Sequence, residues 1–120
     1  MDNNIEIDIE LREKWLQALE SGEYEQGSSY LRTCNDEFCC LGVLAALSGV
    51  EWHQRTGEAK RVFQYETETG AEQFAFSDRA LNMRVGILGY ATDLAEMNDT
   101  GSSFAEIAAY IREQGIRNEQ

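Results

Sequence analysis

The segment Phe38–Leu47 constrains the fold of this chain most, because nearly all of its residues are apolar. Its sequence is F-C-C-L-G-V-L-A-A-L. A helix that is apolar on nearly every side belongs in the interior of a domain. We therefore predict a wholly buried helix over 39–47, around which the core is organised. Gly42 inside it costs about 1 kcal/mol relative to alanine, which indicates that another segment packs closely against that position.

Amphipathic helices are predicted on both sides of this run. In Ile9–Glu20, apolar residues recur at helical spacing, and Asp8 is a suitable N-cap. Further short helices are expected over 77–85 and 92–97, followed by a turn at 98–101. The sequence Ser103–Glu106 forms a capping box, which opens a last helix that ends at Gly115.

The middle third of the chain has strand character. Aromatic and polar residues alternate at 62–65 and at 74–76, on either side of a turn at 67–70. The segment 50–54 can add a third strand. The chain of 120 residues is thus predicted to be an α+β single domain over 1–120. It would have about four helices packed on a short antiparallel sheet of two or three strands.

The charge of the chain limits its partners. Ten Lys and Arg oppose 22 Asp and Glu, so the net charge is −12. Phosphate contacts need Lys and Arg, so we expect neither direct nucleic-acid binding nor membrane binding. No stretch approaches the ~20 apolar residues of a membrane span, and the acidic N-terminus is unlike a signal peptide. A cytoplasmic protein that is drawn to basic partner surfaces fits this pattern.

The residues that often carry catalysis form no recognisable set. Cys34, Cys39, Cys40 and His53 match no zinc spacing, so neither a metal nor a cofactor is predicted. The adjacent cysteines lie in an apolar run and are interpreted as small buried packing residues. No catalytic residue is assigned. A small hydrolase that uses His53 or a cysteine is kept as an alternative.

One stretch departs from the acidic background and is the main candidate for ligand binding. Between Trp52 and Arg61, three cations oppose one carboxylate. Cations beside an aromatic ring suit an anionic, ring-bearing ligand such as a nucleotide. The candidate residues, with a second set from the loop before the apolar run, are Trp52, His53, Arg55, Lys60, Arg61, Tyr24, Gln26 and Arg32. The alternatives are a charged, solvated hairpin edge for the first set and structural hydrogen bonds for the second.

Two motifs near the ends of the chain carry a family resemblance. The first is W-x2-AL-x-SG-x-Y-x-QG from Trp15 to Gly27, followed by the run FCCLGVL at 38–44. The second is L-x2-MND-x-G-x-SF-x2-IA from Leu94 to Ala108. The pattern resembles a family of short proteins that are widespread in bacteriophage genomes. The resemblance implies a non-enzymatic accessory protein that counteracts bacterial antiviral defence.

Two modes of action follow as expectations. In the first, which we favour slightly from sequence alone, the chain sequesters a nucleotide immune signal. In the second, its acidic first and last helices occlude a basic host defence protein, as a nucleic-acid mimic does. A homo-oligomer is left open, because no residue demands one.

Overall fold

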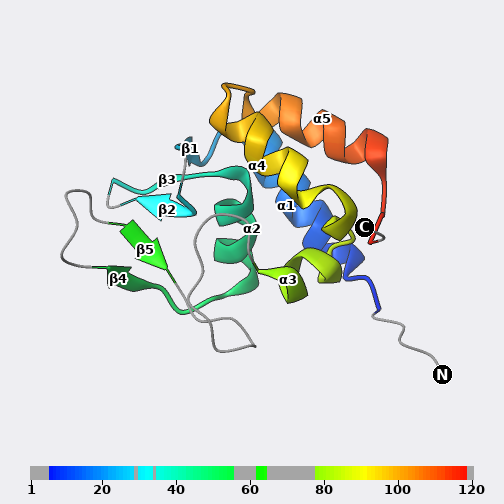
Figure 1. Cartoon of the computed structure of the whole chain (residues 1–120), viewed down its shortest axis with the longest axis horizontal. Coiled ribbons are helices and arrows are strands. Elements are labelled where there is room, and N and C mark those ends of the chain that lie inside the picture. Colours follow the sequence, from blue (N-terminus) through cyan, green and yellow to red (C-terminus); the bar gives the residue numbers. More distant parts are fainter. Residues whose placement is uncertain (1–5, 29, 34, 56–61, 65–77, 119–120) are drawn as a thin grey trace.

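The computed structural model describes residues 6–28, 30–33, 35–55, 62–64 and 78–118, with the backbone alone at 54–55 and 62–64. These residues form five α-helices, one 3-10 helix and five short strands (Figure 1). In chain order they are α1 (Ile9–Ser21), β1 (Glu25–Gln26), β2 (Arg32–Thr33), β3 (Glu37–Phe38), α2 (Cys40–Ser48), β4 (His53–Arg55), β5 (Val62–Gln64), α3 (Arg79–Arg84), η1 (Leu88–Tyr90), α4 (Ala91–Asp99) and α5 (Phe104–Gln114). The α+β prediction is confirmed. Within the described ranges, no helix is both long and apolar enough to span a membrane.

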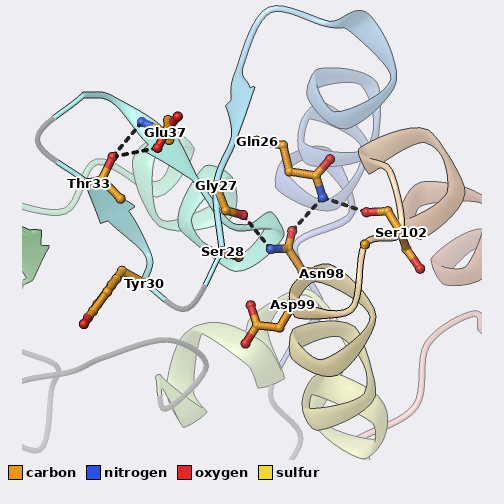
Figure 2. A pocket seen from close by; sticks show the side chains of 10 residues that line it. Gln26, Gly27, Ser28, Tyr30, Thr33, Glu37, Asn98, Asp99 and Ser102 are labelled. Carbon is orange, nitrogen blue, oxygen red and sulfur yellow. Dashed lines mark hydrogen bonds between the residues drawn. The ribbon is translucent and has the colours of Figure 1, made fainter.

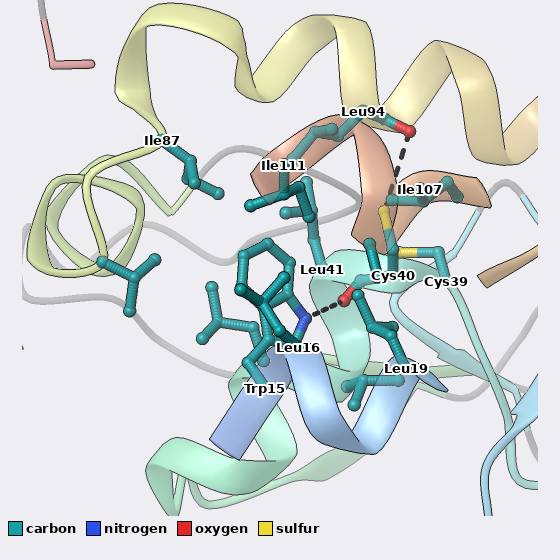
Figure 3. Packing of buried hydrophobic residues seen from close by; sticks show 14 of the residues in the cluster. Trp15, Leu16, Leu19, Cys39, Cys40, Leu41, Ile87, Leu94, Ile107 and Ile111 are labelled. Carbon is teal, nitrogen blue, oxygen red and sulfur yellow. Dashed lines mark hydrogen bonds between the residues drawn. The ribbon is translucent and has the colours of Figure 1, made fainter. Parts of the chain in front are cut away.

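Helix α2 lies at the centre of the molecule, as the apolar run predicts. Helices α1 and α4 pack against it, and α5 packs on α1 and α4 (Figure 1). Residues Cys40–Ala45 of α2 are all buried. Trp15 of α1 is fully buried beside them and donates from its indole Nε1 to the Cys40 carbonyl oxygen at 2.8 Å (Figure 3). One apolar core therefore joins segments from both ends of the chain.

Gly42 is explained by the close approach of another segment. A Cβ atom at this position would lie 1.8 Å from the carbonyl oxygen of Leu31, and Leu31 itself is buried. Because that oxygen belongs to the backbone, no rotamer change could make room. The prediction that a neighbour packs against Gly42 is confirmed.

The sheet is larger than the sequence indicates. Its strands follow the order β1-β3-β2-β5-β4, and β1 is parallel to β3 while the other pairs are antiparallel. The expected third strand at 50–54 is present as β4, which pairs with β5. The expected strand at 74–76 lies outside the described residues. The restriction of the sheet to the middle third was wrong, because β1, β2 and β3 lie within 25–38 and are too short to show alternation.

Most predicted helix ends are confirmed. Asp8 caps α1 by accepting from the Leu11 amide at 2.9 Å, and both bonds of the capping box at Ser103 are present. The expected turn at 98–101 was placed too early, because α4 continues through Asp99. The consequence is that Asn98 and Asp99 occupy the last turn of a helix, beside the start of α2.

Candidate functional site

A hollow of about 500 Å³ opens where α4 ends beside β1 and β3 (Figure 2). Its wall is mainly polar and is drawn from three parts of the chain. The residues that line it are Gln26, Gly27, Ser28, Tyr30, Thr33, Glu37, Asn98, Asp99, Gly101 and Ser102. Two of the sequence motifs contribute to this wall, one from each end of the chain.

Asn98 is the buried centre of the wall, with 4% of its surface exposed. Its Oδ1 accepts from the backbone amide of Cys40 at 3.1 Å and from Gln26 Nε2 at 3.0 Å. Its Nδ2 donates to the Gly27 carbonyl oxygen at 2.7 Å. Asn98 therefore caps the first turn of α2 from a different helix, because Cys39, the N-cap residue, supplies no side-chain hydrogen bond of its own.

Gln26 completes the same network from β1. Its Nε2 also donates to the Ser102 carbonyl oxygen at 2.7 Å, and its Oε1 accepts from the Phe104 amide at 3.2 Å. Both hydrogens of this amide group are thus used within the protein. Gln26 was predicted as a ligand-binding residue, whereas the structure places its side chain in a bridge between β1, α4 and the start of α5.

We call Gln26 and Asn98, with the backbone groups that they bind, the amide bridge. Sequence reasoning expected Asn98 to bond with nearby backbone amides, but its partners Gly27 and Cys40 lie far away in sequence. Such long-range hydrogen bonds leave no periodic signal in a single sequence. The bridge explains in physical terms why the two motifs contain Gln, Gly and Asn at these places.

The charged groups of the hollow are acidic. Glu37 of β3 and Asp99 of α4 are both exposed. None of the described residues that line the hollow is Lys, Arg or His. The hollow also lies at the C-terminal end of α4, where the helix dipole is negative. This setting favours a cation and disfavours a phosphate.

Three of the residues predicted to bind a ligand gather elsewhere, around Phe38. The Arg32 guanidinium carbon lies 5.5 Å from the ring centroids of both Phe38 and Trp52. Tyr24 meets the Phe38 ring edge-on, with 5.2 Å between centroids. Arg32 Nη2 also donates to Asp36 Oδ1 at 2.7 Å, so its guanidinium already has a carboxylate partner. We call these five residues the arginine–aromatic cluster.

The remaining predicted residues do not join this cluster in the described structure. His53 is exposed in β4, one residue after the half-buried Trp52. The backbone of Arg55 pairs with Val62 of β5, and its side chain is not described. Lys60 and Arg61 lie outside the described residues. The predicted basic site is therefore placed only in part, and its role stays a prediction.

Cys39 and Cys40 are buried, as the sequence analysis expected. Burial raises the pKa of the Cys39 thiol to about 11 and raises the pKa of Cys40 as well. Cys40 Sγ lies 3.7 Å from the Leu94 carbonyl oxygen (Figure 3). A nucleophilic thiol needs a lowered pKa and access to its substrate, and these two have neither. Within the described part of the chain, no group of three or more His, Cys, Asp or Glu could hold a metal ion.

Several carboxylates of α1 are neutralised by arginines. Arg112 of α5 binds Glu13 at 3.0 Å and Glu20 at 2.9 Å, and this pairing lowers the pKa of both carboxyl groups. Asp8 is held in the same way by Arg84 at 2.9 Å. The surface of α1 and α5 is thus less negative than the sequence suggests.

A second group of carboxylates lies along α4. Asp93, Glu96 and Asp99 are all exposed and recur every three residues, so they share one side of the helix. They continue to Glu37 across the hollow. We call these four carboxylates the acidic edge.

Comparison with known proteins identifies the family of this chain. A family model described as Domain of unknown function (DUF8296) matches residues 7–115, and the chain therefore belongs to that family. No curated protein and no solved structure matches the chain. The matched region includes all described helices and strands.

Proposed function

We propose that this member of the DUF8296 family is a non-enzymatic, phage-type binding protein that counteracts a bacterial antiviral defence by occluding a basic host protein. The observation that carries the proposal is the acidic edge beside a polar hollow with no described cationic lining residue. Complementary charge accelerates encounter with a basic surface and selects against acidic partners.

The acidic edge is a better docking surface than α1 and α5, which were favoured from sequence. Glu13 and Glu20 are engaged by Arg112, and Glu106 accepts from the Ser103 amide within the capping box. A partner would have to displace those contacts before it could use the carboxylates. Glu96 and Asp99 present their charge beside a concave surface instead, which offers shape as well as charge.

A second candidate function is the sequestration of a nucleotide signal, favoured by the arginine–aromatic cluster. Trp52 is half-buried and Arg32 lies over its ring, an arrangement that nucleotide-binding proteins use for bases and phosphates. We rank it second because Arg32 is already paired with Asp36, and a phosphate would have to compete with that carboxylate.

The test is affinity capture from the bacterial host with the tagged chain, followed by elution with rising salt. We expect one basic host protein, released as screening weakens the contact. A variant with Asp93→Asn and Glu96→Gln should lose most of it. A matched control with Glu10→Gln and Glu23→Gln changes the net charge equally on exposed residues away from α4 and should retain the partner.

Other outcomes of the same experiment contradict the proposal. If the control loses the partner as fully as the α4 variant, net charge rather than the acidic edge is responsible. If no protein is captured and heat releases an intact nucleotide from the purified chain, sequestration replaces occlusion. If the released nucleotide is chemically altered, the chain is an enzyme and both binding proposals fall.

A further inference from the structure

We propose that the hollow is a pocket for a single arginine side chain of the basic partner, with Asp99 and Glu37 as the groups that bind its guanidinium. This inference rests on the proposed function for the identity of the partner but not for the chemistry of the pocket. The argument begins with the groups that the pocket offers to a ligand.

The wall of the pocket is fixed before any ligand arrives. The amides of Gln26 and Asn98 are committed to Cys40, Gly27, Ser102 and Phe104 through hydrogen bonds of 2.7–3.2 Å. A wall held in this way does not have to be ordered upon binding, so less affinity is lost to entropy. Figure 2 shows the two amides on one side of the pocket, with Asp99 beside Asn98.

The charges of the pocket select a cation. Asp99 ends α4 and adds its carboxylate to the negative end of the helix dipole, and Glu37 contributes a second carboxylate from β3. A phosphate or carboxylate ligand would be repelled by both groups. The ligand therefore carries positive charge.

The shape and composition of the pocket favour guanidinium over ammonium. Acceptors lie on two different elements, β3 and α4, and a guanidinium presents five N–H groups that spread in a plane. Tyr30 lines the same pocket and offers an aromatic ring on which a guanidinium can stack. A volume of about 500 Å³ holds one long side chain but not a folded segment.

The experiment titrates the 15N-labelled chain with N-acetyl-arginine amide at low ionic strength and follows amide resonances by NMR. We expect saturable shifts confined to residues around the hollow. N-acetyl-lysine amide should bind more weakly, and the neutral isostere N-acetyl-citrulline amide should not bind. Asp99→Asn and Glu37→Gln should each weaken the arginine probe about fivefold or more, because a charge-assisted contact is removed.

Glu96→Gln is the matched control, because it removes one exposed carboxylate from the same helix one turn before the hollow. It should change the affinity less than about twofold. The inference is overturned if all three variants weaken the probe equally, if citrulline binds as well as arginine, or if the shifts spread along α4 without saturation. The dispersion of each spectrum shows whether the variant is folded, and Glu37→Gln decides the matter if Asp99→Asn unfolds.

Failure of this inference and failure of the proposed function are distinguishable. If the α4 variant loses the host protein while Asp99→Asn and Glu37→Gln keep it, occlusion stands and the arginine pocket falls. If the arginine probe binds as expected but no host protein is captured, the pocket stands and the proposed function falls.

Discussion

Replacing Asn98 by alanine should destabilise the fold far more than its position near the end of a helix suggests. Three hydrogen bonds are lost at once, to the Cys40 amide, the Gln26 side chain and the Gly27 carbonyl. The Cys40 amide is buried, and it belongs to the first turn of α2, where no backbone carbonyl can replace the lost partner. The substitution therefore leaves a buried donor unsatisfied.

The magnitude follows from these contacts. An unsatisfied buried donor costs about 1–3 kcal/mol, and each of the other two hydrogen bonds contributes about 0.5–1.5 kcal/mol net. Partial replacement by water at the hollow reduces the sum, so we expect about 2–4 kcal/mol for Asn98→Ala. For a chain of this size, about 1 kcal/mol moves the melting temperature by roughly 4 °C, which gives a decrease of roughly 8–16 °C.

Urea unfolding followed by circular dichroism measures this cost, with Glu96→Ala in the same helix as the control. The control removes an exposed side chain and should stay within about 0.5 kcal/mol of the unsubstituted chain. Gln26→Ala tests the other half of the bridge. Because both single variants break the bond between Gln26 and Asn98, their summed costs should exceed the cost of the double variant by about 0.5–1.5 kcal/mol. A cost below about 1 kcal/mol for Asn98→Ala, or strict additivity, would refute the reasoning.

Three further predictions concern other parts of the structure. Gly42→Ala should lower stability by about 3 kcal/mol or more in urea unfolding, despite alanine's higher helix propensity, and a neutral effect would contradict the packing. The pKa of Glu13 is lowered mainly by its hydrogen bond to Arg112, so this pair stabilises the fold above the ordinary value of 4.5 and the effect fades as pH falls further. The difference in melting temperature between the unsubstituted chain and Arg112→Gln should therefore shrink between about pH 6 and pH 3, and a constant difference would disprove the linkage. With a pKa of about 11, Cys39 is thiolate in about one molecule in a thousand at about pH 8, so peptide mapping should find it alkylated only after unfolding.

The helical part of the fold was predictable because its signals are local. The apolar run identifies α2, and the capping box and Asp8 fix the starts of α5 and α1 within a residue. Strands of two residues carry no such signal, since alternation needs at least four residues to be recognised. The parallel pairing of β1 with β3 could not be inferred either, because it depends on contacts made after the chain has folded.

The candidate site was less predictable for a related reason. Sequence reasoning chose cations and aromatic rings, and the structure does bring Tyr24, Arg32 and Trp52 together. It could not show that Asp36 already pairs with Arg32, or that Gln26 belongs to a different network. A hydrogen-bond partner far away in sequence decides whether a polar side chain is available to a ligand, and a single sequence does not reveal that partner.

The order of residues in the motifs links the stability of the fold to the precision of the hollow. Buried Asn98 immediately precedes exposed Asp99, and exposed Glu37 immediately precedes buried Phe38. Each carboxylate of the hollow is thus held by a neighbour in the chain that is fixed in the amide bridge or the core. Substitution of Asn98 should therefore lower both the stability and the affinity for the arginine probe, whereas Asp99→Asn should lower the affinity and leave the melting temperature much less changed. A site built in this way needs no rigidity of its own, because the first residue of each buried contact supplies it.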